Sequence, residues 1–191
     1  LLITPYYNKP TQEGLFQHFS AVAKETDLPI ILYNVPSRTS INMVSSTVAR
    51  LSSVRNIVGI KEASGSLVQV SEIIDSCGPD FEVISGEDAL TWPILAIGGK
   101  GAISVTANLV PDKCAKMCRA AREGDVDKAK ELHYELLKLN DILFIETNPI
   151  PVKAALALMG RIRNEFRPPL CAPTEEHLSQ LKAVLETYEL L

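Results

Sequence analysis

A lysine that closes an apolar run is the side chain best suited to covalent chemistry in this sequence. Lys61 ends the run 57–61, which reads IVGIK, and runs of this kind form strands that are buried on both faces in α/β proteins. At the end of such a strand a lysine can lie in a pocket with little water, where desolvation lowers the pKa of its ammonium group. The free amine can then attack a carbonyl carbon and form a Schiff base. A lysine that points into solvent is the alternative, and the short run alone favours that alternative.

A tyrosine lies at the corresponding place on the preceding apolar run. Tyr33 follows Ile31 on one face of the run 30–34, and parallel strands end at the same edge of a sheet, so Tyr33 and Lys61 can meet there. A phenol in this place can pass a proton during addition to a carbonyl group. The alternative is a tyrosine whose ring packs and whose hydroxyl is in water.

Alternation along the strand of Lys61 predicts the faces of its neighbours. Ile57, Gly59 and Lys61 are expected to share one face, because successive side chains of a strand point to opposite sides. A glycine on this face is expected to leave room beneath the amine for a small keto acid.

The segments that must hold these residues alternate between strand and helix patterns. Five short apolar runs predict strands at 1–4, 30–34, 57–61, 81–85 and 102–105, and helical periodicity predicts helices at 12–25, 44–51, 67–76, 88–97 and 111–123. Such alternation is typical of a parallel sheet with right-handed crossovers. Neither a GxGxxG motif after the first strand nor a GxxxxGK[ST] motif is present, which gives little support to a dinucleotide-binding or P-loop protein.

Beyond Gly124 the pattern is helical only. Helices are expected at 125–144, 148–159 and 174–188, with Thr174 as the N-cap of the last one. The sequence therefore predicts two domains, βα units over residues 1–124 and a helical domain over residues 125–191.

Composition narrows the function classes. The chain has 191 residues, 46% hydrophobic and 22% charged, which is ordinary for a globular protein. A net charge of -4 gives no basic field for nucleic acid or an anionic membrane, and no apolar stretch reaches the ~20 residues of a membrane-spanning helix. Four cysteines without a CxxC pair, and three scattered histidines, favour free thiols in a reducing compartment. We therefore expect a cytoplasmic protein without a metal ion and without a signal peptide.

Five segments together resemble the dihydrodipicolinate synthase family, the class I aldolase-like enzymes of lysine biosynthesis. They are TPYYNKP at 4–10, LYNVPSRT at 32–39, GIKEA at 59–63, AISVTAN at 102–108 and NPIPVK at 148–153. The resemblance covers essentially all 191 residues. It implies an α/β fold of the eight-stranded TIM-barrel family, here a partial barrel of strands 4 to 8 followed by the C-terminal helical domain. The three missing βα units would carry the GTTGE-type motif whose threonine hydroxyls bind pyruvate.

The resemblance also implies roles for four aromatic or basic residues. Lys61 corresponds to the Schiff-base lysine, and Tyr33 to the proton donor and acceptor beside it. Tyr7 corresponds to a relay tyrosine that reaches across a subunit interface into the neighbouring site, and Tyr6 to a position lining the family's allosteric lysine site. Packing at an interface is the alternative for Tyr6 and Tyr7.

Three further residues are candidates for substrate binding. Arg38 would bind the carboxylate of an incoming aldehyde through two parallel hydrogen bonds, although an arginine in a surface ion pair is the alternative. Ile103, expected on the strand 102–105, would contact pyruvate through its backbone or be ordinary core. Gly86 would let the backbone approach the same edge of the sheet or serve only as a turn glycine.

The reaction implied is the condensation of pyruvate with L-aspartate 4-semialdehyde to 4-hydroxy-tetrahydrodipicolinate, through an imine on Lys61 and without a metal or other cofactor. The family assembles as a homotetramer, a dimer of dimers. One alternative is another pyruvate-dependent aldolase such as N-acetylneuraminate lyase, whose loop lacks an arginine matching Arg38. The other is an inactive fragment or binding module, since part of the family's site has no counterpart here.

Overall fold

The computed structural model describes residues 1–191, which form two compact units, Leu1–Ile103 and Ser104–Leu191. The boundary predicted after Gly124 falls within the second unit. The assignment of residues 1–124 and 125–191 to separate domains stays a prediction.

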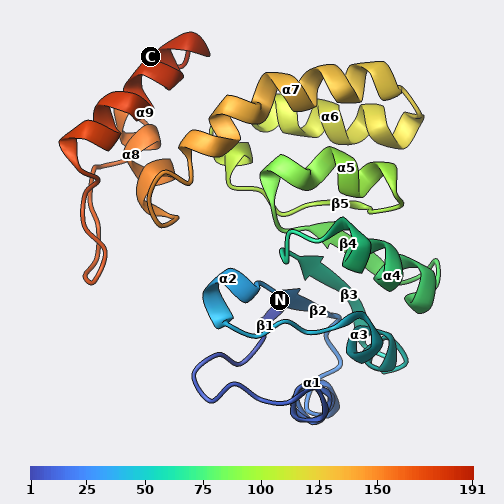
Figure 1. Cartoon of the computed structure of the whole chain (residues 1–191). Helices are drawn as coiled ribbons and strands as arrows, with labels where there is room; N and C mark the ends of the chain where they lie inside the picture. Colours follow the sequence, from blue (N-terminus) through green and yellow to red (C-terminus); the bar gives the residue numbers. More distant parts are fainter. The chain divides into compact units, whose positions relative to one another are not determined.

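The first unit is built on a parallel sheet of five strands. The strands are β1 (Leu2–Ile3), β2 (Ile30–Asn34), β3 (Ile57–Glu62), β4 (Glu82–Ser85) and β5 (Gly101–Ala102). They lie side by side in the order of the sequence, so each crossover joins neighbouring strands (Figure 1). The prediction of an α/β protein with a parallel sheet is therefore confirmed.

Helices follow the strands in this unit. They are α1 (Gln12–Lys24), α2 (Pro36–Thr39), α3 (Ser45–Ser52), α4 (Leu67–Cys77), the 3-10 turn η1 (Asp88–Leu90) and α5 (Thr91–Ala96). Thr11 caps α1 by accepting a hydrogen bond from the Gly14 N–H, and the helix buries Leu15 and Phe19 four residues apart. The short helix α2 was not predicted. Pro36 lies in its first turn and a left-handed Ser40 ends it, which places it directly beyond the end of β2 (Figure 1).

Helices pack on one face of the sheet, and the side chains of the other face are more exposed. Leu32, Ile60 and Val83 belong to one buried cluster with Leu15 and Phe19 of α1, together with side chains of α3 and α4. The opposite face carries half-buried side chains. Tyr33 and Lys61 belong to this second face, because they alternate with the buried Leu32 and Ile60.

A register shift interrupts the alternation in β3. Ile30 pairs with Ile57 and Ile31 with Gly59, so Val58 is skipped. Ile57 consequently lies in the same buried cluster as Ile60, and the prediction that it shares a face with Lys61 was wrong. The interpretation of Gly59 also changes: a Cβ there would lie 2.4 Å from the backbone oxygen of Glu82. The glycine is required for the close approach of β4.

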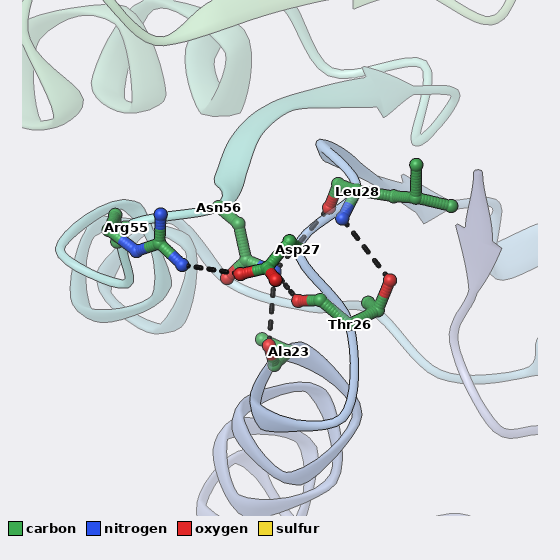
Figure 2. Close-up of polar contacts among 6 residues, drawn as sticks. All are labelled: Ala23, Thr26, Asp27, Leu28, Arg55 and Asn56. Carbon is green, nitrogen blue, oxygen red and sulfur yellow. Dashed lines mark hydrogen bonds and ion pairs between the residues drawn. The ribbon is translucent and has the colours of Figure 1, made fainter.

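The amino ends of β2 and β3 are fastened by one buried amide. The side chain of Asn56 donates to the carbonyl oxygens of Ala23 at 3.0 Å and Thr26 at 2.8 Å, at the end of α1 (Figure 2). Its own carbonyl accepts from the Ile30 N–H at 2.7 Å. The start of β3 thus holds both the loop that leads into β2 and the first residue of β2.

The second unit is helical. It comprises the 3-10 turn η2 (Thr106–Asn108) and the helices α6 (Pro111–Glu123), α7 (Val126–Ile142), α8 (Ile150–Leu158) and α9 (Glu175–Thr187). A left-handed Gly124 ends α6 and turns the chain into α7, which packs on α6. Thr174 caps α9 as predicted, accepting a hydrogen bond from the His177 N–H. Neither unit contains a helix long and apolar enough to cross a membrane.

Candidate active site

Lys61 and Tyr33 are brought together at the carboxyl end of the sheet. They are direct register partners in the neighbouring strands β2 and β3. The Lys61 Nζ lies over the Tyr33 ring, 4.3 Å from its centroid, and both side chains are half-buried. The meeting of these residues, predicted from two apolar runs, is thus present in the structure.

Burial shifts both groups toward their uncharged forms. Desolvation lowers the pKa of Lys61, the nearby carboxylate of Asp88 opposes this shift, and the Arg38 guanidinium adds to it. Desolvation raises the pKa of Tyr33, while Arg38 lowers it by a smaller amount. An amine with a lowered pKa next to a protonated phenol has the properties of a nucleophile with a proton donor beside it.

Gly86 lies directly beside the lysine side chain. It follows β4, and its N–H donates to the Glu62 carbonyl at 2.8 Å. A Cβ at this position would come within 3.0 Å of the Lys61 Cε and 2.9 Å of the Ala63 Cβ. The absence of a side chain therefore lets the backbone at Gly86 pass close to the Lys61 side chain.

Ile103 and Arg38 lie at the same end of the sheet. Ile103 follows the two-residue strand β5 and does not lie on it as predicted, because pairing with β4 in the ladder ends at Ala102. Its N–H still donates to the Ser85 carbonyl at 2.9 Å, and its side chain is 40% exposed. Arg38 occupies the last turn of α2 and is exposed, close enough to affect the pKa values of both Tyr33 and Lys61.

Tyr6 and Tyr7 are not brought into this group within one chain. They lie in the turn after β1, with side chains 62% and 93% exposed. The roles expected for Tyr7 at a neighbouring site and for Tyr6 at an allosteric site stay predictions.

Two acidic residues near the pair were missed by the sequence interpretation. Asp88, only 8% exposed, opens the turn η1 after β4 and acts electrostatically on Lys61. Glu62, 1% exposed, directly follows Lys61, and burial raises the pKa of its carboxyl group despite several hydrogen bonds. Alternation along the strand places Glu62 on the face opposite Lys61, as the sequence predicts, but its burial and its hydrogen bonds were not predicted. The sequence gives no comparable signal for Asp88.

The structure contains no cluster of three or more His, Cys, Asp or Glu side chains that could hold a metal ion. The cysteines are free thiols; Cys77, Cys114 and Cys118 are half-buried, and Cys171 is exposed.

Comparison with known proteins identifies relatives along the whole chain. The profile of the dihydrodipicolinate synthetase family matches residues 1–188. A 4-hydroxy-tetrahydrodipicolinate synthase of Nitratidesulfovibrio vulgaris strain DP4 is 56% identical over 186 residues, which are 97% of this chain and 64% of that protein. The chain thus spans 64% of the length of this curated relative.

Solved structures agree with this match. The dihydrodipicolinate synthase of Aquifex aeolicus superimposes with a TM-score of 0.96 at 48% identity, over 98% of this chain and 64% of that one. The chloride-inhibited enzyme of Acinetobacter baumannii, solved with pyruvate, superimposes with a TM-score of 0.97 at 43% identity, over 100% of this chain and 65% of that one.

Proposed function

Because the chain belongs to the dihydrodipicolinate synthetase family, we propose that it carries the Schiff-base centre of a lyase, 4-hydroxy-tetrahydrodipicolinate synthase. The observation that carries the proposal is the half-buried Lys61 amine lying 4.3 Å from the centroid of the Tyr33 ring. A lysine with a lowered pKa at the carboxyl end of a parallel sheet suits attack on a keto acid. The α/β TIM-barrel fold of the relatives places active sites at that end of the strands.

The first step is imine formation. The Lys61 amine attacks the ketone carbon of pyruvate and gives a carbinolamine. Loss of the former ketone oxygen as water gives the iminium ion, and the Tyr33 hydroxyl donates and accepts the protons that this exchange requires. The backbone at Gly86 and at Ile103 forms the proposed binding place of the keto acid.

The second step forms the carbon–carbon bond. The iminium ion draws electrons from the methyl group, which loses a proton and becomes an enamine carbon. That carbon attacks the aldehyde of L-aspartate 4-semialdehyde, whose carboxylate Arg38 binds through two parallel hydrogen bonds. The amino group of the same substrate then attacks the imine carbon, closes the ring and releases Lys61. One water is lost in the sum of all steps, and the product is 4-hydroxy-tetrahydrodipicolinate.

The finer architecture is also part of the proposal. The five sequential parallel strands correspond to strands 4 to 8 of the family's barrel, with the helical residues 125–191 as the C-terminal domain. Each outer strand, β1 and β5, has a sheet partner on one side only, and unpaired strand edges favour association.

A homotetramer is the proposed assembly, with Tyr7 reaching into a neighbouring site. The segment around β1 exposes apolar side chains, among them Leu1 at 61%, Ile3 at 42%, Tyr6 at 62% and Tyr7 at 93%. Apolar side chains that gather on a surface are typical of interfaces. The free cysteines suit the reducing cytoplasm as the location.

Turnover with a substrate panel tests the proposed function. The full-length protein is supplied with pyruvate and one of several aldehydes, and separately with sialic acid, and the products are identified by mass spectrometry. We expect condensation with L-aspartate 4-semialdehyde and loss of turnover in Lys61→Ala. Cleavage of sialic acid without that condensation would assign the chain to another pyruvate-dependent aldolase, and unchanged turnover in Lys61→Ala would refute the proposal.

A further inference from the structure

A buried carboxylate lies behind the two strands that carry Lys61 and Tyr33. Glu62 directly follows Lys61, and Asn34, which is fully buried, directly follows Tyr33. Glu62 and Asn34 are themselves register partners. Because side chains alternate along a strand, this second pair lies on the covered face of the sheet while Lys61 and Tyr33 lie on the other face.

Both carboxylate oxygens of Glu62 accept hydrogen bonds from neutral donors. The Ser64 N–H donates to Oε1 at 2.6 Å, and the Gln69 Nε2 of α4 donates to Oε2 at 3.3 Å. The Asn34 Nδ2 lies 3.2 Å from Oε1 and 3.1 Å from Oε2. A buried carboxylate that no cation contacts is costly unless hydrogen bonds satisfy it, and here hydrogen-bond donors face both of its oxygens.

The orientation of each donor is fixed by a second partner. The Asn34 Oδ1 accepts from the Met43 N–H at 3.0 Å, which turns its Nδ2 toward Glu62. The Gln69 Oε1 accepts from Asn42 Nδ2 at 2.8 Å, which turns its Nε2 the same way. Donors therefore face both oxygens of Glu62. A glutamine at position 62 has the same shape, yet its NH₂ group would always face a donor.

The cluster ties together the segments that end at the candidate site. It joins the last residues of β2 and β3 to α4 through Gln69 and to the segment before α3 through Met43. Backbone bonds continue the connection, since the Ala63 N–H donates to the Asn34 carbonyl at 2.9 Å. Hydrogen bonds on the covered face of the sheet thus fix the carboxyl ends of β2 and β3, where Tyr33 and Lys61 lie on the opposite face.

We propose that Glu62 is a positioning residue for the candidate site: its carboxylate fixes the ends of β2 and β3 and thereby the place of the Lys61 amine against the Tyr33 ring. The inference rests on the proposed function, because the arrangement of Lys61 and Tyr33 that Glu62 would fix is the one proposed for Schiff-base formation. Positioning errors of about 1 Å reduce rates by about 100-fold. Loss of the carboxylate is therefore expected to slow catalysis far more than it weakens substrate binding.

The test compares Glu62→Gln with Asn56→Ala in the full-length protein. Asn56 fastens the amino ends of the same two strands (Figure 2), so its variant disturbs the same sheet at the end away from the site. We measure the melting temperature, kcat and KM of each, and the rate at which borohydride traps pyruvate on Lys61. We expect Glu62→Gln to lower kcat and the trapping rate by about 100-fold with KM changed less than about twofold. The Asn56→Ala rates should stay near those of the wild type below its melting temperature.

A milder variant covers the case in which Glu62→Gln does not fold. Gln69→Met removes one donor to Glu62 and one donor to the Met43 carbonyl. It leaves the Nδ2 of Asn42, which is exposed, able to bind water, while the Asn42 Oδ1 keeps its bond from Asn34. It is expected to fold and to lower the trapping rate more than Asn56→Ala does. If either network variant traps pyruvate as fast as Asn56→Ala, the inference is wrong while the proposed function stands. If wild-type protein traps no pyruvate, the proposed function fails and the inference fails with it.

Discussion

Substitution of Gly86 by alanine adds a single methyl group next to the Lys61 side chain. The new Cβ would lie 3.0 Å from the Lys61 Cε, 2.9 Å from the Ala63 Cβ and 3.1 Å from the Glu62 carbonyl oxygen. Gly86 is not among the glycines with positive φ, so alanine can adopt its backbone conformation. The effect therefore comes from contact alone.

The magnitude follows from these distances. Carbon atoms in contact are normally about 3.5–4.0 Å apart, so the neighbours must move by about 0.5–1 Å. Movement of the flexible end of Lys61 relieves only one of the three contacts, so Ala63 and the Glu62 backbone must move as well. These movements displace the amine from its place over the Tyr33 ring. A displacement near 1 Å costs about 100-fold in rate, equivalent to about 2.7 kcal/mol in the barrier. Crowding is expected to lower the free energy of unfolding by about 1–3 kcal/mol.

Steady-state kinetics and thermal unfolding measure both effects, and Gly101→Ala is the matched control. Gly101 is the first residue of the outer strand β5 and pairs with Ile84 of β4. It has no positive φ, and nothing lies within 4 Å of an added Cβ. We expect Gly101→Ala to keep the wild-type kcat and Gly86→Ala to lose most of it. Equal kcat values in the two variants would refute the reasoning that space beside Lys61 limits the reaction.

Three further predictions concern binding, pH and stability. Arg38→Ala is expected to raise the KM for the aldehyde by about 10- to 100-fold, because the substrate carboxylate loses its hydrogen bonds to a charged group. The rate of borohydride trapping of pyruvate should not change. An unchanged KM would argue against contact between Arg38 and the substrate carboxylate. Burial lowers the pKa of Lys61 in the folded state, so between that pKa and the ordinary value of about 10.4 the unfolded chain binds more protons, and stability rises with pH. The melting temperature of Lys61→Met should therefore exceed that of the wild type at neutral pH, by a margin that narrows as pH rises through this window; a constant margin would contradict the assigned shift. Asn56→Ala should lower the free energy of unfolding by about 1–3 kcal/mol, because buried carbonyls lose their donor. Arg55→Ala, which breaks the exposed pair with Asp27 (Figure 2), should change the free energy of unfolding by less than about 0.5 kcal/mol. Similar losses for the two variants in a denaturant titration would show that Asn56 does not hold the amino ends of β2 and β3.

Local patterns were sufficient to predict the main elements and the central pair. Apolar runs and helical periodicity located the strands and the long helices, and parallel strands necessarily end together, so Tyr33 and Lys61 were placed side by side. The helix α2 has only four residues, too few to produce a period, and it was missed. The two-residue strand β5 was placed too late because hydrogen bonding with β4, rather than apolar character, sets its limits.

Features that depend on distant residues could not be predicted. The register shift at Val58 arises from pairing between β2 and β3, which no single run reveals. The donors to Glu62 come from Asn34, 28 residues before it, and from Gln69, seven residues after it. The closeness of Gly59 to the backbone of Glu82 likewise appears only when the strands are assembled.

Site-mapped trapping of pyruvate tests the central claim most directly. The full-length protein is treated with pyruvate and borohydride, digested, and its peptides are sequenced by mass spectrometry, with Lys61→Ala treated in parallel. We predict one reduced pyruvyl group per chain, attached to the Nζ of Lys61, and none in the variant. An unmodified Lys61, or the same adduct on another lysine in both proteins, would contradict the account.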